Sequence, residues 1–165
     1  MADAAPATMR LDDVQTGTIR PLTQTELKSV LSSLKDIAKR EPAVADLMTG
    51  DSPLRDFVAS AFTLSPYLRD AASADEGLLT LAISEPLEEA LGALVEQVRE
   101  CWRPCEDGTT PTEAEVMTTL RVAKRRLSFI AALADLGRIF TARDTTRWLS
   151  DMADAALSAA IDHLL

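Results

Sequence analysis

The sequence has few aromatic and β-branched residues. Phe, Trp and Tyr together make up 4% of the 165 residues. Strands favour aromatic and β-branched side chains, whereas alanine and leucine, which dominate here, favour helices. No segment alternates apolar and polar residues as a half-buried strand does. We therefore predict an all-α fold, a bundle of about seven helices with a long central helix near residues 112–139.

Excess basic charge and long apolar runs are also missing. The formal net charge is −9 at pH 7, and a negative field repels nucleic-acid phosphates and anionic lipid. No apolar run approaches the roughly 20 residues of a membrane span. Residues 1–20 lack the apolar core of a secretory signal. We expect no nucleic-acid partner, no membrane partner and a cytoplasmic location.

The groups that usually perform catalysis are scarce. His163 is the only histidine and lies in an amphipathic segment near the C-terminus, where we interpret it as a surface or interface residue rather than a base beside a nucleophile. The six glycines are scattered, so no glycine-rich phosphate loop is present. Cys101 and Cys105 are interpreted as reduced structural thiols, because a metal site usually needs about four ligands.

Two pairs of adjacent acidic residues, Asp12–Asp13 and Glu88–Glu89, are interpreted as solvated. Neighbouring side chains point in different directions, and neither pair has an evident basic or metal-binding partner in the sequence. We therefore predict no catalytic, cofactor-binding or metal-binding residue in this chain.

Helix-start signals divide the chain into an irregular arm over residues 1–20 and a single helical domain over residues 21–165. Helix starts are often marked by a pair of capping residues three positions apart. The side chain of the first residue bonds the backbone amide of the second, and the side chain of the second bonds the backbone amide of the first. Four pairs precede helical stripes: Thr23–Glu26, Ser73–Glu76, Thr112–Glu115 and Thr141–Asp144. Ser84 is expected to open a further helix.

The last helix carries an apolar stripe that reaches the end of the sequence. Its members are Leu149, Met152, Ala153, Ala156, Leu157, Ala160, Ile161 and Leu164. Helices usually finish with a glycine or polar stop signal, and none follows here. We expect that the natural chain continues; the alternative is a terminal helix that frays.

The long helix combines a basic cluster with a nearly all-apolar half. The predicted core residues are Leu127, Ile130, Leu133 and Leu136. The basic cluster comprises Arg121, Lys124, Arg125 and Arg126. One helix face is shared by Arg121, Arg125, Ser128, Ala132 and Asp135, at spacings of 4, 3, 4 and 3.

Asp135 falls within the most apolar stretch, where a buried carboxylate would need a partner, and Arg138 is the nearest candidate. This five-residue face has two interpretations. It is either a solvated face with an internal ion pair or a docking surface for another domain or an anionic ligand.

Several segments resemble one known family. They are the basic run at 120–126, AALADLG at 131–137, TTRWLSDMADAAL at 145–157 and, earlier, SPYLRD at 65–70. Residues 112–165 resemble the helical segment ahead of a nucleotidyltransferase domain in bifunctional glutamine synthetase adenylyltransferase/adenylyl-removing enzymes. The resemblance is patchy over residues 52–100 and not evident before residue 20.

The resemblance implies that this chain is the N-terminal helical part of an enzyme that adds AMP to, and removes it from, a tyrosine of glutamine synthetase. In that family the catalytic residues lie downstream, in a Gly-Ser turn and an Asp-x-Asp pair, and neither motif occurs here. Mg²⁺ and ATP as cofactors, and glutamine synthetase and the PII regulatory protein as partners, are implied for the parent enzyme. The alternative is a free-standing helical interaction module that binds a partner through the five-residue face.

Overall fold

The computed structural model describes residues 8–14, 19–21, 23–104 and 108–164. Within these ranges the chain is helical and contains no strand, which confirms the all-α prediction. The elements are η1 (Leu11–Asp13), α1 (Gln24–Ala38), α2 (Pro42–Thr49), α3 (Pro53–Leu64), α4 (Pro66–Ala74), α5 (Leu78–Ser84), α6 (Leu87–Glu100), α7 (Glu113–Leu136) and α8 (Ala142–Leu164). The long helix α7 ends three residues earlier than predicted.

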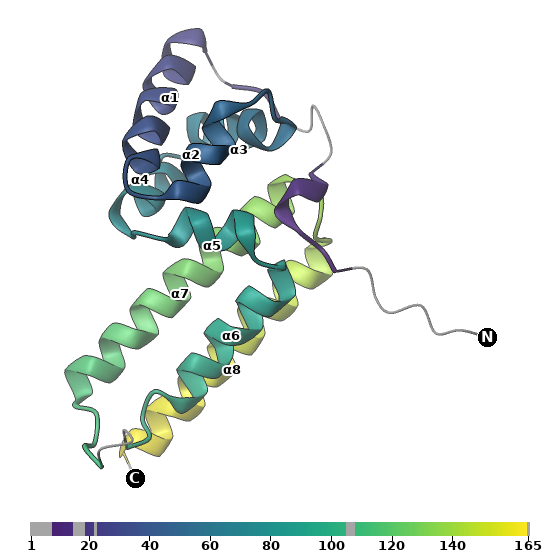
Figure 1. Cartoon of the computed structure of the whole chain (residues 1–165). Coiled ribbons are helices and arrows are strands. Elements are labelled where there is room, and N and C mark those ends of the chain that lie inside the picture. The colour runs from purple at the N-terminus through teal and green to yellow at the C-terminus, as the bar shows by residue number, and fades with distance from the viewer. Residues whose placement is uncertain (1–7, 15–18, 22, 105–107, 165) are drawn as a thin grey trace.

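Helices α6, α7 and α8 run alongside one another and contact each other pairwise (Figure 1). Helices α1 to α4 gather at one end of this three-helix layer. At that end α3 and α4 contact α7, so α7 connects the group of α1 to α4 with the three-helix layer.

The apolar half of α7 forms the centre of the core. Leu127, Ile130 and Leu133 are completely buried, as predicted, whereas Leu136 is only partly buried. The Phe129 ring meets Phe62 of α3 edge to face, with 6.3 Å between ring centroids. This contact joins α7 to the helices at the end of the layer.

Two of the predicted capping pairs are complete. Thr112 Oγ1 accepts the Glu115 amide hydrogen at 3.3 Å, and the Glu115 carboxylate accepts the Thr112 amide hydrogen at 2.7 Å. Thr141 and Asp144 form the same reciprocal bonds, at 3.3 and 2.9 Å. Thr23 Oγ1 accepts the Glu26 amide hydrogen at 3.1 Å.

Two predicted helix starts were wrong. Ser73 lies inside α4, where its hydroxyl donates to the Arg69 carbonyl at 2.8 Å. Ser84 is the last residue of α5, and Pro86 precedes the first residue of α6. Serine also bonds the carbonyl one turn back within a helix, so its presence does not fix a helix start.

A distant carboxylate caps α5. Glu41 is buried and accepts hydrogen bonds from the Gly77 amide at 2.9 Å and the Thr80 amide at 3.1 Å. The Thr80 hydroxyl also donates to it, at 2.7 Å. The amides at the start of α5, which have no partner within the helix, thus donate to Glu41, a residue that precedes α2.

Part of the expected irregular arm is packed in the core. Leu11 is completely buried, and the Met9 carbonyl accepts the Leu87 amide hydrogen at 2.9 Å. Val14 of the arm packs tightly against Gly137. A side chain at position 137 would place its Cβ 3.2 Å from Val14 Cγ2 and 3.1 Å from the Leu133 carbonyl oxygen. Residues 1–7 and 15–18 of the arm fall outside the described residues.

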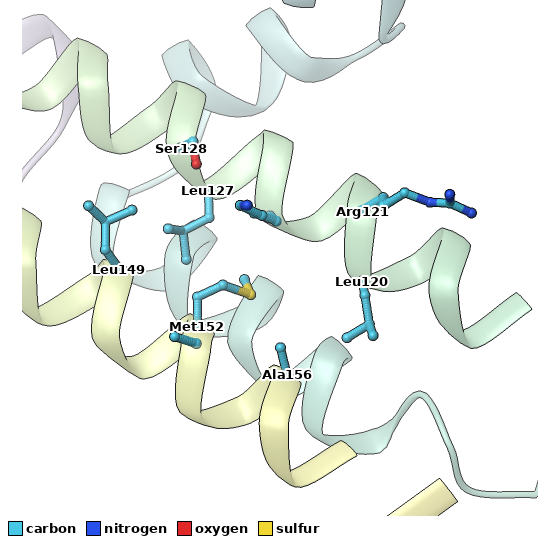
Figure 2. A pocket seen from close by; sticks show the side chains of 9 residues that line it. Leu120, Arg121, Leu127, Ser128, Leu149, Met152 and Ala156 are labelled. Atoms are coloured by element: carbon cyan, nitrogen blue, oxygen red, sulfur yellow. The ribbon is translucent and has the colours of Figure 1, made fainter. Parts of the chain in front are cut away.

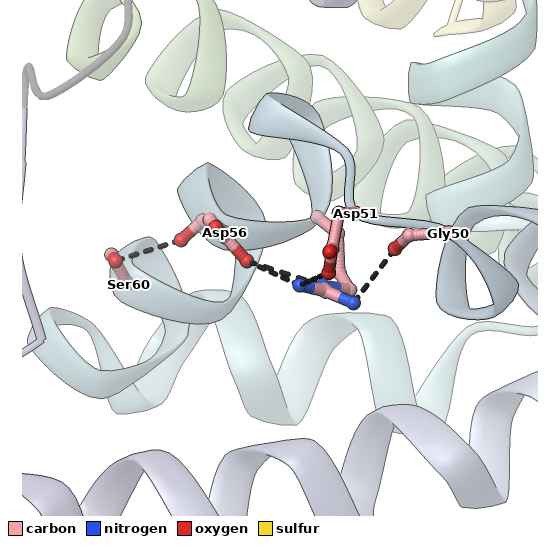
Figure 3. A network of polar contacts seen from close by, with 5 residues as sticks. Gly50, Asp51, Asp56 and Ser60 are labelled. Atoms are coloured by element: carbon pink, nitrogen blue, oxygen red, sulfur yellow. Dashed lines mark hydrogen bonds and ion pairs between the residues drawn. The ribbon is translucent and has the colours of Figure 1, made fainter.

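Arg55 donates hydrogen bonds to residues of the turn between α2 and α3 and of the first turn of α3 (Figure 3). Its guanidinium donates to the Gly50 carbonyl at 2.7 Å and to the carboxylates of Asp51 and Asp56 at 3.2 and 3.0 Å. Both carboxylates are exposed, so these ion pairs orient the turn but contribute little stability.

Candidate functional site

A hollow of about 300 Å³ lies between α7 and α8 (Figure 2). Its walls are mostly apolar: Leu120, Leu127, Leu149, Met152, Ala153 and Ala156. Leu120 and Leu127 come from α7 and face residues of α8 across the hollow. We call this feature the α7–α8 groove.

The polar groups of the groove come from α7. Arg121, Lys124 and Ser128 line it together with the apolar walls. Arg121 Nε donates to the Met117 carbonyl one turn back, at 3.1 Å. Neither Arg121 nor Lys124 forms an ion pair with any residue that the structure describes. The groove therefore has a cationic edge in an acidic protein.

The other two cations of the basic cluster serve the fold. Arg126 donates to both oxygens of Asp75, at 3.1 and 2.6 Å, and Arg125 donates to one of them at 3.1 Å. Asp75, which follows α4, has a side chain that is only 6% exposed. Hydrogen bonding to Arg126 holds the pKa of the Asp75 carboxyl below its usual value, with Arg125 adding to the effect and burial opposing it. Sequence analysis missed Asp75, because its partners lie about fifty positions away in the chain.

The five residues of the candidate docking face, Arg121, Arg125, Ser128, Ala132 and Asp135, have different surroundings in the structure. Arg121 and Ser128 line the groove, whereas the Arg125 guanidinium is bonded to Asp75. Ala132 is partly buried. Asp135 is exposed, so it needs no buried partner, and it forms no ion pair with Arg138, the candidate from the sequence. Its carboxylate accepts a long hydrogen bond from Thr145 at 3.5 Å. A charged residue within an apolar stretch points outward when the helix keeps one side in water.

The α8 stripe also differs from the predicted arrangement. Met152, Ala155 and Ala159 form the buried side of α8, whereas Leu149, Leu157 and Ile161 are 46%, 62% and 47% exposed. Small alanines allow α8 to approach α6 and α7 closely, which leaves the larger side chains of the broad apolar face outside.

The histidine and the cysteine that the structure describes, His163 and Cys101, do not lie in the α7–α8 groove. His163 is partly exposed in the last turn of α8. Cys101 is a free, partly buried thiol just after α6, and burial raises its pKa, which disfavours the reactive thiolate. Cys105 lies outside the described residues.

Both predicted acidic pairs are exposed, as expected for solvated residues. Glu88 nevertheless has a basic partner that the sequence analysis did not foresee, since Arg147 of α8 donates to it at 3.1 Å. Both side chains are about half exposed. The bond joins α6 to α8 at the protein surface.

The acidic residues do not gather into a ligand set for Mg²⁺. Across the described ranges, no three histidine, cysteine, aspartate or glutamate side chains are placed to hold a metal ion. Mg²⁺ binding with nucleotide phosphates depends on converging carboxylates, so the described residues do not fit such a site. None of the described helices has the length and apolar character needed to span a membrane.

The comparisons with known proteins agree on one family. Residues 56–165 match the family model of glutamate-ammonia ligase adenylyltransferase. No solved structure shows significant similarity to the chain.

Similar proteins carry the name bifunctional glutamine synthetase adenylyltransferase/adenylyl-removing enzyme. The protein of Agrobacterium fabrum is 73% identical over 94% of this chain, and that of Rhizobium meliloti is 48% identical over 94%. The protein of Mesorhizobium japonicum is 33% identical over 89%. The aligned region spans only 15–16% of each relative's length. Because the family model matches more than half of its residues, this chain belongs to the glutamate-ammonia ligase adenylyltransferase family.

Proposed function

We propose that this chain is the N-terminal, non-catalytic helical part of an enzyme that adds AMP to glutamine synthetase and removes it, and so regulates nitrogen assimilation. The observation that carries the proposal is the 73% identity, over 94% of the chain, to a protein named for both reactions. We refer to the longer protein as the full-length enzyme.

The chemistry of the transfer assigns catalysis to the rest of the enzyme. Moving an adenylyl group requires nucleotide phosphates that are held by metal ions and positioned for attack. The described residues offer no carboxylate cluster for this task. ATP and Mg²⁺ are therefore expected to bind a nucleotidyltransferase domain elsewhere in the full-length enzyme, and the helical part supports that domain. The PII regulatory protein is a proposed partner on the basis of the family resemblance alone.

Residues 21–165 are proposed to form a single domain of this enzyme. One continuous cluster of buried apolar side chains draws on helices from α1 to α8. Contacts between α7 and both α3 and α4 support the same organisation.

The experiment uses the full-length enzyme with purified glutamine synthetase. Transfer of label from α-labelled ATP with Mg²⁺ tests addition, and release from adenylylated glutamine synthetase with inorganic phosphate tests removal. We expect both reactions. A folded full-length enzyme that performs neither reaction contradicts the proposal. A natural reading frame that stops at residue 165 would instead favour the free-standing interaction module.

A further inference from the structure

The surface formed by α7 and α8 leaves large apolar side chains in water. Six large hydrophobic residues are exposed in the described parts of the chain, and four belong to these two helices: Met117, Leu149, Leu157 and Ile161. Leu149, Ala153, Leu157 and Ile161 follow each other at intervals of four, so they form a ridge along α8. A contiguous apolar surface of this kind marks an interaction site more often than single exposed residues do.

The α7–α8 groove lies beside this ridge and shares residues with it. Leu149 and Ala153 belong to both. Leu120 reaches toward α8, while Arg121 extends away from it (Figure 2). An apolar hollow between two adjacent helices suits the apolar face of a third helix.

The two cations at the groove, Arg121 and Lys124, indicate which charge a helix bound there should carry along its edge. Arg121 and Lys124 border the groove and form no ion pair among the described residues, although the chain has 26 acidic side chains and a net charge of −9. A helix seated in the groove would meet these two cations with its own flank. Carboxylates on that flank would complement them, and cations would be repelled.

The geometry points to an amphipathic helix with acidic residues along one edge, contributed by the remaining polypeptide of the full-length enzyme, as the occupant of the α7–α8 groove. This inference rests on the proposal that the chain is part of a longer enzyme. The relatives aligned to this chain use only 15–16% of their length for the match, so the rest of such a chain is available as the occupant. A second copy of this chain is disfavoured, because two bodies of net charge −9 repel each other.

Photo-crosslinking in the full-length enzyme tests this inference. p-Benzoylphenylalanine is placed at the exposed groove position Ala153 and, as a matched control, at Ser158, which is exposed on another side of α8. After irradiation, the crosslinked peptides are identified by mass spectrometry. The expected result is an intramolecular crosslink from position 153 to a helical, acidic segment outside residues 1–165, with little product from position 158.

Charge reversal supplies the second measurement. Arg121→Glu with Lys124→Glu is expected to lower the crosslink yield from position 153 about fivefold, since like charges across an interface oppose docking. The control is Lys28→Glu with Lys35→Glu on α1, which changes the net charge equally at exposed positions away from the groove. The control should leave the yield unchanged.

Three results overturn the inference. They are a crosslinked dimer joined through position 153, a yield at 153 no higher than at 158, and equal yields from the two charge-reversal variants. The crosslink does not require adenylyl transfer. An active enzyme without the crosslink therefore refutes only the docking inference, whereas a crosslinked enzyme without activity refutes only the proposed function.

Discussion

Arg126 of α7 donates two hydrogen bonds to Asp75, one to each carboxylate oxygen, at 3.1 and 2.6 Å. Asp75 closes α4, so this pair joins the N-terminal helices to the long helix. Arg125 adds one bond at 3.1 Å, while its Nε is buried without a hydrogen-bond partner among the described residues. The two arginines therefore make unequal contributions to the same contact.

Arg126→Ala is expected to destabilise the protein more than Arg125→Ala. Loss of Arg126 removes two charged hydrogen bonds from a buried carboxylate and should lower the free energy of unfolding by about 2–3 kcal/mol. Arg125→Ala removes one bond and also an unsatisfied buried donor, so about 1 kcal/mol is expected. Urea unfolding of the two variants measures the difference, and equal losses would contradict the geometry.

The same contact predicts a dependence of stability on pH. The bond to Arg126 lowers the folded-state pKa of Asp75, so the folded protein takes up this proton less readily than the unfolded chain. The contribution is complete above the unfolded pKa of about 4 and is lost as pH falls through the lower folded value.

Asp75→Asn should weaken this part of the acid dependence. The cap carboxyls Glu115 and Asp144 also have lowered pKa values, through hydrogen bonds with Thr112 and Thr141. The informative quantity is therefore the difference in unfolding free energy between wild type and variant, measured from pH 7 to pH 2. A difference that stays constant across this range would show that Asp75 does not titrate as described.

Truncation of the α7 core should be costly. Ile130 and Leu133 are completely buried, and removing such a side chain typically costs about 2–5 kcal/mol. We expect Ile130→Ala and Leu133→Ala each to lower the melting temperature clearly. In the isolated 165-residue chain, Leu157→Ala is the matched control, because Leu157 is 62% exposed there and its truncation should change stability by less than about 0.5 kcal/mol. Neutral core variants would refute the packing of α7.

Glu41→Gln tests the remote cap of α5. The carboxylate accepts three hydrogen bonds from Gly77 and Thr80, whereas an amide has one accepting oxygen and would turn its NH₂ group toward donors. A loss of about 1–3 kcal/mol is expected. Hydrogen exchange should increase at the first amides of α5. Unchanged protection there would show that Glu41 does not cap the helix.

The sequence predicted those features that depend on neighbouring residues. The Thr112–Glu115 and Thr141–Asp144 caps lie within one helical turn, so their residue types determine the bonds. The burial of Leu127, Ile130 and Leu133 was predicted from the nearly all-apolar second half of the long helix, since a helix that is apolar on most sides is buried.

Features that depend on distant partners were missed. Asp75 and Arg126 are 51 positions apart, and Glu41 is 36 positions from Gly77, so no local pattern connects them. The side on which α8 packs was also not predictable, because apolar residues occupy most of its circumference and alanine size decides which side is buried. Arg125 was placed on the candidate docking face because its partner, Asp75, follows α4 and lies 50 positions away in the chain.

Assay of the purified 165-residue chain alone, with glutamine synthetase, α-labelled ATP and Mg²⁺, measures whether this helical part is catalytic. The same chain is also given adenylylated glutamine synthetase and phosphate. In both directions we expect turnover no greater than that of a blank without protein, while the full-length enzyme is active under the same conditions. Turnover by the pure 165-residue chain above the blank would contradict the assignment of this domain as non-catalytic.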